Sequence, residues 1–458
     1  MVFNTRMRLA FHGAPRVRAR VLCAIAALAC AFGAATAPPA TAAEKVIWGP
    51  VTLPGGASAF PTYRELGVDT LQLQVDWRAV APSRPANPQN PADSAYRWPA
   101  EIDRAISQGA ANGVRIALLV QNSPGWANGG RSPIYAPNAA EFGTFVAAAS
   151  RRYPAVRRWM IWGEPNRDDR FLPNADGSSV GPRTYAPILD AAYEALKRVS
   201  PQNVVIGGMT WTGGTVKPAP FLRMMRLPNG RPPRLDWFGH NPYPFRFPNL
   251  RETWIPGGWR DISDMDTFTD ELQRTYGPQA RFWLSEFTVL SDKPSGEFIS
   301  FVSREAQAQW LTAGFRIADD LPSIAGMAWF TLLDQPERVG GSNTGLLTGG
   351  GARKPAYEAF RQAPSARFTP GVRAAPLVRK RSVLLRGLRV RVRPKAGGRI
   401  LVELRTRRGR RVRRGSTGAE AGRLRTVKLR RARLPRGPYT LVIRAPRGET
   451  VRRNVTLR

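Results

Sequence analysis

Eight short apolar runs recur through residues 46–330, and they restrict the fold more than any other feature of this chain. The runs are apolar almost throughout, as strands buried on both faces must be, and they lie at 46–48, 70–75, 115–120, 159–162, 204–209, 235–239, 282–286 and 325–330. Helix-like stretches stand between them at 99–112, 139–153, 185–199, 264–276 and 303–318. Parallel strands that alternate with helices in this way predict an α/β fold, a single (β/α)8 TIM barrel with insertions.

An open doubly wound sheet is the alternative arrangement of the same elements. Such sheets bind nucleotides at a Gly-rich loop that follows an early strand, and no run of this sequence is followed by one. We therefore expect a barrel that uses no nucleotide cofactor.

The distribution of charge and of tryptophan divides the chain into two domains. Residues 371–458 hold 29 Lys and Arg against three Glu, a net +26 of the whole chain's +36, whereas all 13 Trp lie before residue 330. A stretch with Pro364 and Pro370 at its ends stands between the two parts, as a linker would. We assign residues 44–362 to the barrel, 363–375 to a linker and 376–458 to a basic second domain.

The first 43 residues resemble a secretory signal peptide. Five Arg between Arg6 and Arg20 precede an apolar run at 21–35, and the small residues Ala40-Thr-Ala-Ala43 follow. The run is shorter than the ~20 residues that a membrane span needs, so cleavage near Ala42 and a secreted or envelope-associated protein are expected, with an uncleaved anchor as the alternative.

Removal of this leader would leave a chain with one histidine and no cysteine. Both cysteines and His12 lie in the first 30 residues, and His240 is the remaining histidine. Disulfide scaffolds, thiol nucleophiles and zinc sites that need two His or Cys ligands are therefore excluded for the mature protein, and no metal is expected.

Two glutamates close otherwise apolar runs, at Arg158-Trp-Met-Ile-Trp-Gly-Glu164 and Arg281-Phe-Trp-Leu-Ser-Glu286. In a TIM barrel the chemistry is placed at the C-terminal ends of the strands, here the fourth and the seventh. A pair of carboxylates across a cleft is what glycosidic bond cleavage requires, one to protonate the leaving oxygen and one to attack the anomeric carbon. Glu164 as a cap of a helix that begins at Pro165 is the structural alternative.

The strand-end motifs together resemble the clan A glycoside hydrolases, retaining barrel enzymes that include families 5 and 39. The resemblance spans about residues 46–362 and rests on Trp162-Gly-Glu-Pro-Asn166, His240, Leu284-Ser-Glu-Phe287 and Trp329. It implies that Glu164 is the acid/base, that Glu286 is the nucleophile and that Tyr243 orients the nucleophile. The chain departs from the family where Gly163 replaces an Asn that binds the sugar 2-hydroxyl, and where His240-Asn-Pro-Tyr243 is one residue longer than the family's His-x-Tyr.

Further strand-end side chains are candidates for substrate binding. They are Asn166, His240, Tyr243, Trp329, Trp77, Asn122 and Trp211, with Asp76 and Gln121 as weaker candidates. Tryptophan faces suit the apolar faces of sugar rings, but aromatic residues are equally common in cores, so both roles stay open for each Trp. Xylosidase, glucanase and galactosidase activities all remain open.

The basic domain alternates apolar residues with Arg at 382–392, 399–405, 424–429 and 439–444, which predicts a small antiparallel β-sandwich. Its charge favours an anionic cell-envelope polymer as a partner, while nucleic acid is not expected. Plain solvation of the exposed strand faces by Arg is the alternative.

Three classes of function follow, in this order. The first is a secreted retaining glycosidase that acts on β-linked oligo- or polysaccharides. The second is a barrel that binds glycans without hydrolysis or transfers them, held at an anionic envelope surface by its basic tail. The third is an anchoring or nucleic-acid-binding protein built around that tail, which the size and the separate site of the barrel disfavour.

Overall fold

A computed structural model describes residues 43–251, 256–296, 300–336 and 341–364, together with parts of the second domain at 372–374, 388–392, 397–406, 409–419, 425–429, 437–444 and 450–457. Residues 1–42 of the predicted signal peptide, with Cys23, Cys30 and His12, and most of the linker lie outside the described residues. No described helix is long and apolar enough to cross a membrane.

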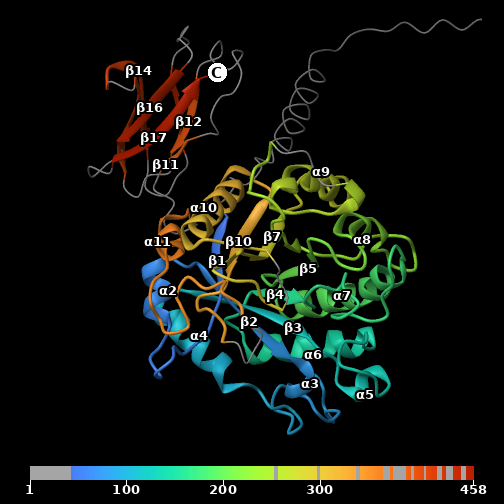
Figure 1. The fold of residues 1–458 in the computed structure, drawn as a ribbon. Helices are drawn as coiled ribbons and strands as arrows, with labels where there is room; N and C mark the ends of the chain where they lie inside the picture. The colour runs from blue at the N-terminus through green and yellow to red at the C-terminus, as the bar shows by residue number, and fades with distance from the viewer. Residues whose placement is uncertain are drawn as a thin grey trace, which may run out of the picture. The chain divides into compact units, whose positions relative to one another are not determined.

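Eight parallel strands close into a barrel in the order β1-β10-β7-β6-β5-β4-β3-β2 (Figure 1). They are β1 (Glu44–Trp48), β2 (Thr70–Asp76), β3 (Arg115–Gln121), β4 (Arg158–Ile161), β5 (Val204–Trp211), β6 (Trp237–Asn241), β7 (Phe282–Phe287) and β10 (Ile324–Phe330). Each strand overlaps an apolar run of the sequence, so the predicted TIM barrel is confirmed. The numbering skips because β8 (Leu290–Ser291) and β9 (Phe301–Val302) pair with each other outside the barrel.

Helices surround the barrel and follow its strands (Figure 1). The longer ones are α2 (Phe60–Leu66), α4 (Ala100–Asn112), α6 (Ala139–Arg152), α7 (Val180–Val199), α8 (Pro218–Met224), α9 (Met265–Tyr276), α10 (Arg304–Asp320) and α11 (Pro355–Gln362). Short turns of helix are α3 (Trp77–Val80), α5 (Gly125–Asn128), η1 (Pro256–Gly258) and η2 (Ile262–Asp264). Local sequence explains several ends: Asn138 caps the first amides of α6, Ser303 caps α10, and Gly113 ends α4 at φ 68°.

The barrel has two apolar layers. Side chains such as Leu119, Met160, Ile206 and Trp283 fill its interior, while alternate residues of the same strands pack outward against the helices. This two-sided burial is the physical reason for runs that are apolar almost throughout.

The charged side chains at the two ends of the barrel have different surroundings. At the N-terminal end Glu44 accepts hydrogen bonds or ion pairs from Arg158, Arg115 and Thr70, which are the first residues of β4, β3 and β2. Glu44 thus has partners on three neighbouring strands, and these contacts link four strands. Structural contacts therefore account for Glu44, whereas the carboxylates at the C-terminal end of the barrel are the candidates for chemistry.

The basic domain contains two antiparallel sheets. One has the order β11-β12-β15 (Val372–Ala374, Leu388–Val392, Arg425–Leu429), and the other has the order β14-β13-β16-β17 (Arg411–Ala419, Gly398–Thr406, Gly437–Arg444, Thr450–Leu457). Residues of both sheets, among them Val390, Val427, Val402 and Leu441, share one hydrophobic cluster. The predicted antiparallel sandwich is thus confirmed. Strand β11 falls within residues 363–375, which we assigned to the linker, so the sheet begins earlier than expected.

Candidate active site

Glu164 stands in a sharply turned segment directly after β4. Both Trp162 (φ 61°) and Glu164 (φ 51°) adopt left-handed backbone conformations, which non-glycine residues seldom do. The turn is held from both sides, since the amide of Gly163 donates to Gln121 Oε1 (3.0 Å) and the amide of Glu164 donates to the Met209 carbonyl (3.0 Å). A strained residue held by two neighbouring strands is typical of a functional site.

The surroundings of Gly163 explain why this position departs from the clan A pattern. A β-carbon at this position would lie 2.7 Å from Gln121 Oε1 and 3.3 Å from Leu119 Cδ2. The amide side chain of Gln121 thus occupies the space beside Gly163 into which a side chain at that position would extend.

The Glu164 carboxylate is buried and receives two hydrogen bonds. Asn241 Nδ2 donates to Oε1 (2.9 Å) and Arg167 Nη1 donates to Oε2 (2.9 Å). Burial raises the pKa of Glu164, and the Arg167 charge and the Asn241 amide oppose that rise. Asn241 is itself oriented by the Ser285 hydroxyl, which donates to Asn241 Oδ1. Asn241 therefore connects Glu164 with the strand that carries Glu286.

Glu286 lies at the end of β7 and is partly buried. The phenol of Tyr243 donates to Glu286 Oε2 at 2.5 Å. Tyr243 follows Asn241 by two residues, and the Thr212 hydroxyl donates to the backbone carbonyls of both (3.0 Å each). The end of β6 thus supplies a hydrogen-bond donor to each of the two glutamates.

A polar layer inside the barrel fixes the backbone before Glu286. The Ser285 carbonyl accepts from Trp48 Nε1 and from Gln72 Nε2, both at 2.8 Å. Gln72 Oε1 in turn accepts from Trp283 Nε1 at 2.7 Å. Side chains from β1, β2 and β7 thereby hold Glu286 at its place on the strand.

His240 is fully buried, and its ring points away from the two carboxylates. Nδ1 lies 2.9 Å from Thr210 Oγ1 and 2.8 Å from the Thr210 carbonyl, and Nε2 lies 2.9 Å from the Arg260 carbonyl. Burial lowers the pKa of His240 to about 4, so the ring is neutral at pH 7. His240 was expected as a substrate-binding residue, but both nitrogens of its ring are occupied by β5 and the loop after β6.

Asn166 supports a loop instead of facing the cleft. Its side-chain amide donates to the carbonyls of Trp211, Gly213 and Val216, and its Oδ1 accepts from the Trp211 amide at 2.8 Å. These partners are the last residue of β5 and residues of the segment that follows it. Asn166 therefore holds that segment against the turn that carries Glu164.

The candidate tryptophans have different environments. Trp77 and Trp329 are fully buried: Trp77 stacks on Phe145, and Trp329 donates from Nε1 to the Thr344 carbonyl (2.9 Å). Trp211 is partly exposed and lies under the Arg167 guanidinium, whose carbon is 5.1 Å from the ring centre. Trp211 thus contacts a residue that itself hydrogen-bonds Glu164.

Asn122 and Asp76 form a pair of their own at the ends of β3 and β2. Asn122 has φ 66° and donates from Nδ2 to Asp76 Oδ2 (2.8 Å), and Asp76 also caps α3 through the Ala79 amide. Local structure accounts for both side chains, since Asn122 holds Asp76 and Asp76 holds the first turn of α3.

Sequence reasoning missed two residues of the site, Asn241 and Arg167. Asn241 stands within the quoted His240-Asn-Pro-Tyr243 motif, and its place at a strand end was an available signal. Arg167 follows Glu164 by three residues in a turn, a spacing that the sequence alone does not mark as a contact. Phe330, the partly exposed neighbour of buried Trp329, is a third side chain at the barrel mouth that was not singled out.

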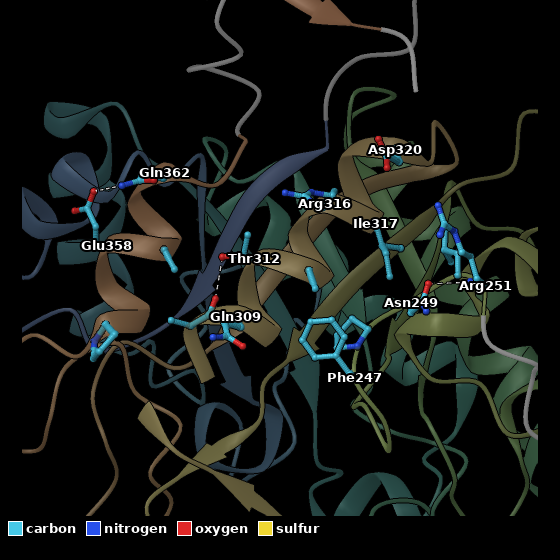
Figure 2. Close-up of a pocket in the computed structure, with 16 residues that line it drawn as sticks. Phe247, Asn249, Arg251, Gln309, Thr312, Arg316, Ile317, Asp320, Glu358 and Gln362 are labelled. Carbon is cyan, nitrogen blue, oxygen red and sulfur yellow. Dashed lines mark hydrogen bonds between the residues drawn. The ribbon is translucent and has the colours of Figure 1, made fainter. Parts of the chain in front are cut away.

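A separate hollow lies on the outer helical layer. It has a volume of about 650 Å³ and is lined by residues of α10, α11 and the segment 247–251, among them Phe247, Thr312 and Gln362 (Figure 2). No strand-end residue lines it. Among the described residues no group of three or more His, Cys, Asp or Glu is placed to hold a metal ion.

Comparisons with known proteins support the fold. No family profile and no curated protein matches the sequence. A family 39 glycoside hydrolase from Bacteroides cellulosilyticus WH2 has a similar structure, with a TM-score of 0.54 and 14% identity over 85% of this chain and 81% of that one. A family 39 enzyme from Xanthomonas axonopodis pv. citri (14% identity, 84% and 91% covered) and a β-xylosidase from Caulobacter crescentus CB15 (13%, 85% and 94%) each give a TM-score of 0.49. At 14% identity the likeness to the Bacteroides enzyme is one of fold.

Proposed function

We propose that this protein is a retaining glycoside hydrolase that cleaves β-linked O-glycosidic bonds of oligo- or polysaccharides. The observation that carries the proposal is the pair of strand-end glutamates, each held by a donor from the end of β6: Asn241 on Glu164 and Tyr243 on Glu286. The two carboxylates have different surroundings, which is what one acid and one nucleophile require. The fold shared with a family 39 hydrolase supports the same conclusion.

The first step of the proposed reaction is glycosylation. The Glu286 carboxylate attacks the anomeric carbon while the bond to the leaving oxygen breaks, and Glu164 gives its proton to that oxygen. Burial of Glu164 favours the protonated acid that this step needs. The hydrogen bond from Tyr243 stabilises the ionised form of Glu286 that must attack.

The second step releases the sugar. Glu164, now a carboxylate, takes a proton from water, the water oxygen attacks the anomeric carbon, and the bond to Glu286 breaks. The sugar leaves with the configuration it had in the substrate, and both glutamates return to their starting protonation states.

We further propose that the protein is exported and that its basic domain binds an anionic cell-envelope polymer. The charged, apolar and small-residue segments of the first 43 residues support export. A net +26 over residues 371–458, where the single aromatic residue, Tyr439, lies in the core of the domain, supports a partner bound through charge instead of aromatic stacking.

Two isosteric substitutions test the reaction with a panel of aryl glycosides. Glu286→Gln should abolish turnover of every substrate, because no nucleophile remains. Glu164→Gln should slow substrates with poor leaving groups most, and azide should partly restore turnover of activated ones because it attacks without base assistance. Wild-type protein that binds glycans but neither hydrolyses nor transfers them would instead support a binding barrel.

A further inference from the structure

Arg167 connects the proposed acid/base to a third carboxylate. Its Nη1 donates to Glu164 Oε2 at 2.9 Å, while Nε and Nη2 donate to the two oxygens of Asp169 at 2.8 and 2.6 Å. One edge of the guanidinium is thus held by a two-point contact with Asp169, and a remaining N–H points at Glu164. The Trp211 ring covers one face of the same group.

This arrangement presents a conflict for an acid catalyst. A cation that donates to a carboxylate stabilises the ionised form, yet Glu164 must begin the reaction protonated. Asp169 reduces the conflict, because it offsets the Arg167 charge and holds the guanidinium by its far edge. Without Asp169 the whole charge of Arg167 would act on Glu164.

Provided that the proposed glycosidase function holds, we propose that Arg167 and Asp169 form a positioning pair that sets the highest pH at which Glu164 still carries the proton for the leaving group. Neither residue transfers a proton or touches the reacting atoms. Arg167 acts on Glu164, and Asp169 acts through Arg167.

In the part of the chain that the structure describes, the charged and titratable groups around Glu164 come from its own segment and from the end of β6. Its own segment supplies Arg167, Asp169 and the more exposed Arg170, whose charge also favours the ionised form. The end of β6 supplies Tyr243, which bonds Glu286 of β7, and His240, whose neutral ring faces Thr210 and Arg260. Arg167 is the cation in hydrogen-bond contact with Glu164, so its removal should have the largest effect among them.

The pair makes an unusual prediction, since neighbouring substitutions should act in opposite directions. Arg167→Met removes the cation and should shift the alkaline limb of the kcat/KM profile to higher pH by about 1 unit. Asp169→Asn leaves the cation without its counter-charge and should lower the same limb by about half a unit. Arg167→Lys keeps the charge and should leave the limb near its wild-type position, with a lower kcat/KM because the two-point contact is lost.

The experiment measures kcat/KM against pH for the three variants on an aryl glycoside with a poor leaving group. Arg198→Met is the matched control, because Arg198 lies on α7 with 72% of its side chain exposed and pairs with Glu194. A dinitrophenyl glycoside needs no acid to protonate its leaving group. With this substrate the variants should therefore show no displacement of the alkaline limb. A merely structural pair would lower kcat/KM at every pH without moving the limb. The proposal is overturned if the alkaline limb stays in place, or if it moves in the same direction in Arg167→Met and Asp169→Asn.

A second measurement separates this proposal from the proposed function. Titration of the carboxyl ¹³C signals of glutamate-labelled protein, with Glu164→Gln to identify the Glu164 signal, gives its pKa without any substrate. Opposite displacements in Arg167→Met and Asp169→Asn support the pair even if no glycoside is cleaved. An unmoved signal contradicts the pair even if hydrolysis is found.

Discussion

The buried imidazole of His240 should make the stability of the barrel depend on pH between 7 and 5. Burial lowers its folded pKa to about 4, whereas an unfolded chain has the ordinary value of 6.5. The unfolded state therefore takes up a proton as the pH falls through 6.5, and the folded state does so only near 4. Stability from this group is present above pH 6.5 and is lost as the pH falls towards 4. With these two values, lowering the pH from 7 to 5 should cost about 2 kcal/mol.

Urea unfolding followed by tryptophan fluorescence measures this effect in the barrel alone, because all 13 Trp precede residue 330. His240→Gln is the comparison, since Gln does not titrate and can still donate to the Arg260 carbonyl. Buried carboxyls such as Glu164 contribute equally to both proteins and cancel in the difference. The variant should lose less stability than the wild type over this interval, by about 2 kcal/mol. Equal losses in the two proteins would refute the argument.

Two more predictions concern the loop after β5 and the basic domain. Gly214→Ala should destabilise the barrel by about 1–3 kcal/mol more than Gly177→Ala in the same fluorescence assay. Both glycines have positive φ, but a β-carbon at 214 would lie 2.3 Å from Asn166 Nδ2, while one at 177 meets nothing within 4 Å. Equal losses of stability in the two variants would contradict the role given to Asn166. Deletion of residues 371–458 should leave hydrolysis of small soluble glycosides nearly intact and weaken retention on anionic surfaces, and retention of the full chain should fall as salt is added; salt-insensitive binding would count against a charge-based partner.

The barrel could be predicted from the sequence because strands covered on both sides leave a strong signal. Each of the eight apolar runs corresponds to a barrel strand, and both glutamates lie at strand ends as expected. Strand β14 (Arg411–Ala419) was missed because Arg-Val-Arg-Arg-Gly-Ser-Thr-Gly-Ala contains almost no apolar residue. It is a strand because it pairs with β13 along nearly its whole length, and pairing leaves no trace in composition.

The directions of side chains at the strand ends were harder to predict. Trp329 and Phe330 are adjacent, and only one of them can face the cleft. The pairing of β10 with β7 changes register between Met327 and Trp329, so counting alternate residues along the strand does not identify which one it is. Trp77 begins α3 immediately after β2 and turns into the core. Ends of strands combine bulges, turns and short helices, and the period of two fails there.

The hydrogen bonds of the site also needed the folded chain. Arg167 and Asn241 contact the same carboxylate although they lie 74 positions apart in the sequence. A motif can identify Glu164, but it does not show which donors surround that carboxylate. Burial of this carboxylate and the two donors, none of which the motif shows, together set the protonation state on which the proposed mechanism depends.

Covalent trapping tests the central claim most directly. A 2-fluoro glycoside with an activated leaving group should accumulate as a glycosyl-enzyme, because the fluorine slows both steps and the good leaving group restores the first. Peptide mass mapping should then find the label on Glu286, and the label should be absent from Glu286→Gln. A label on another residue, or inversion at the anomeric carbon observed by NMR, would contradict the account.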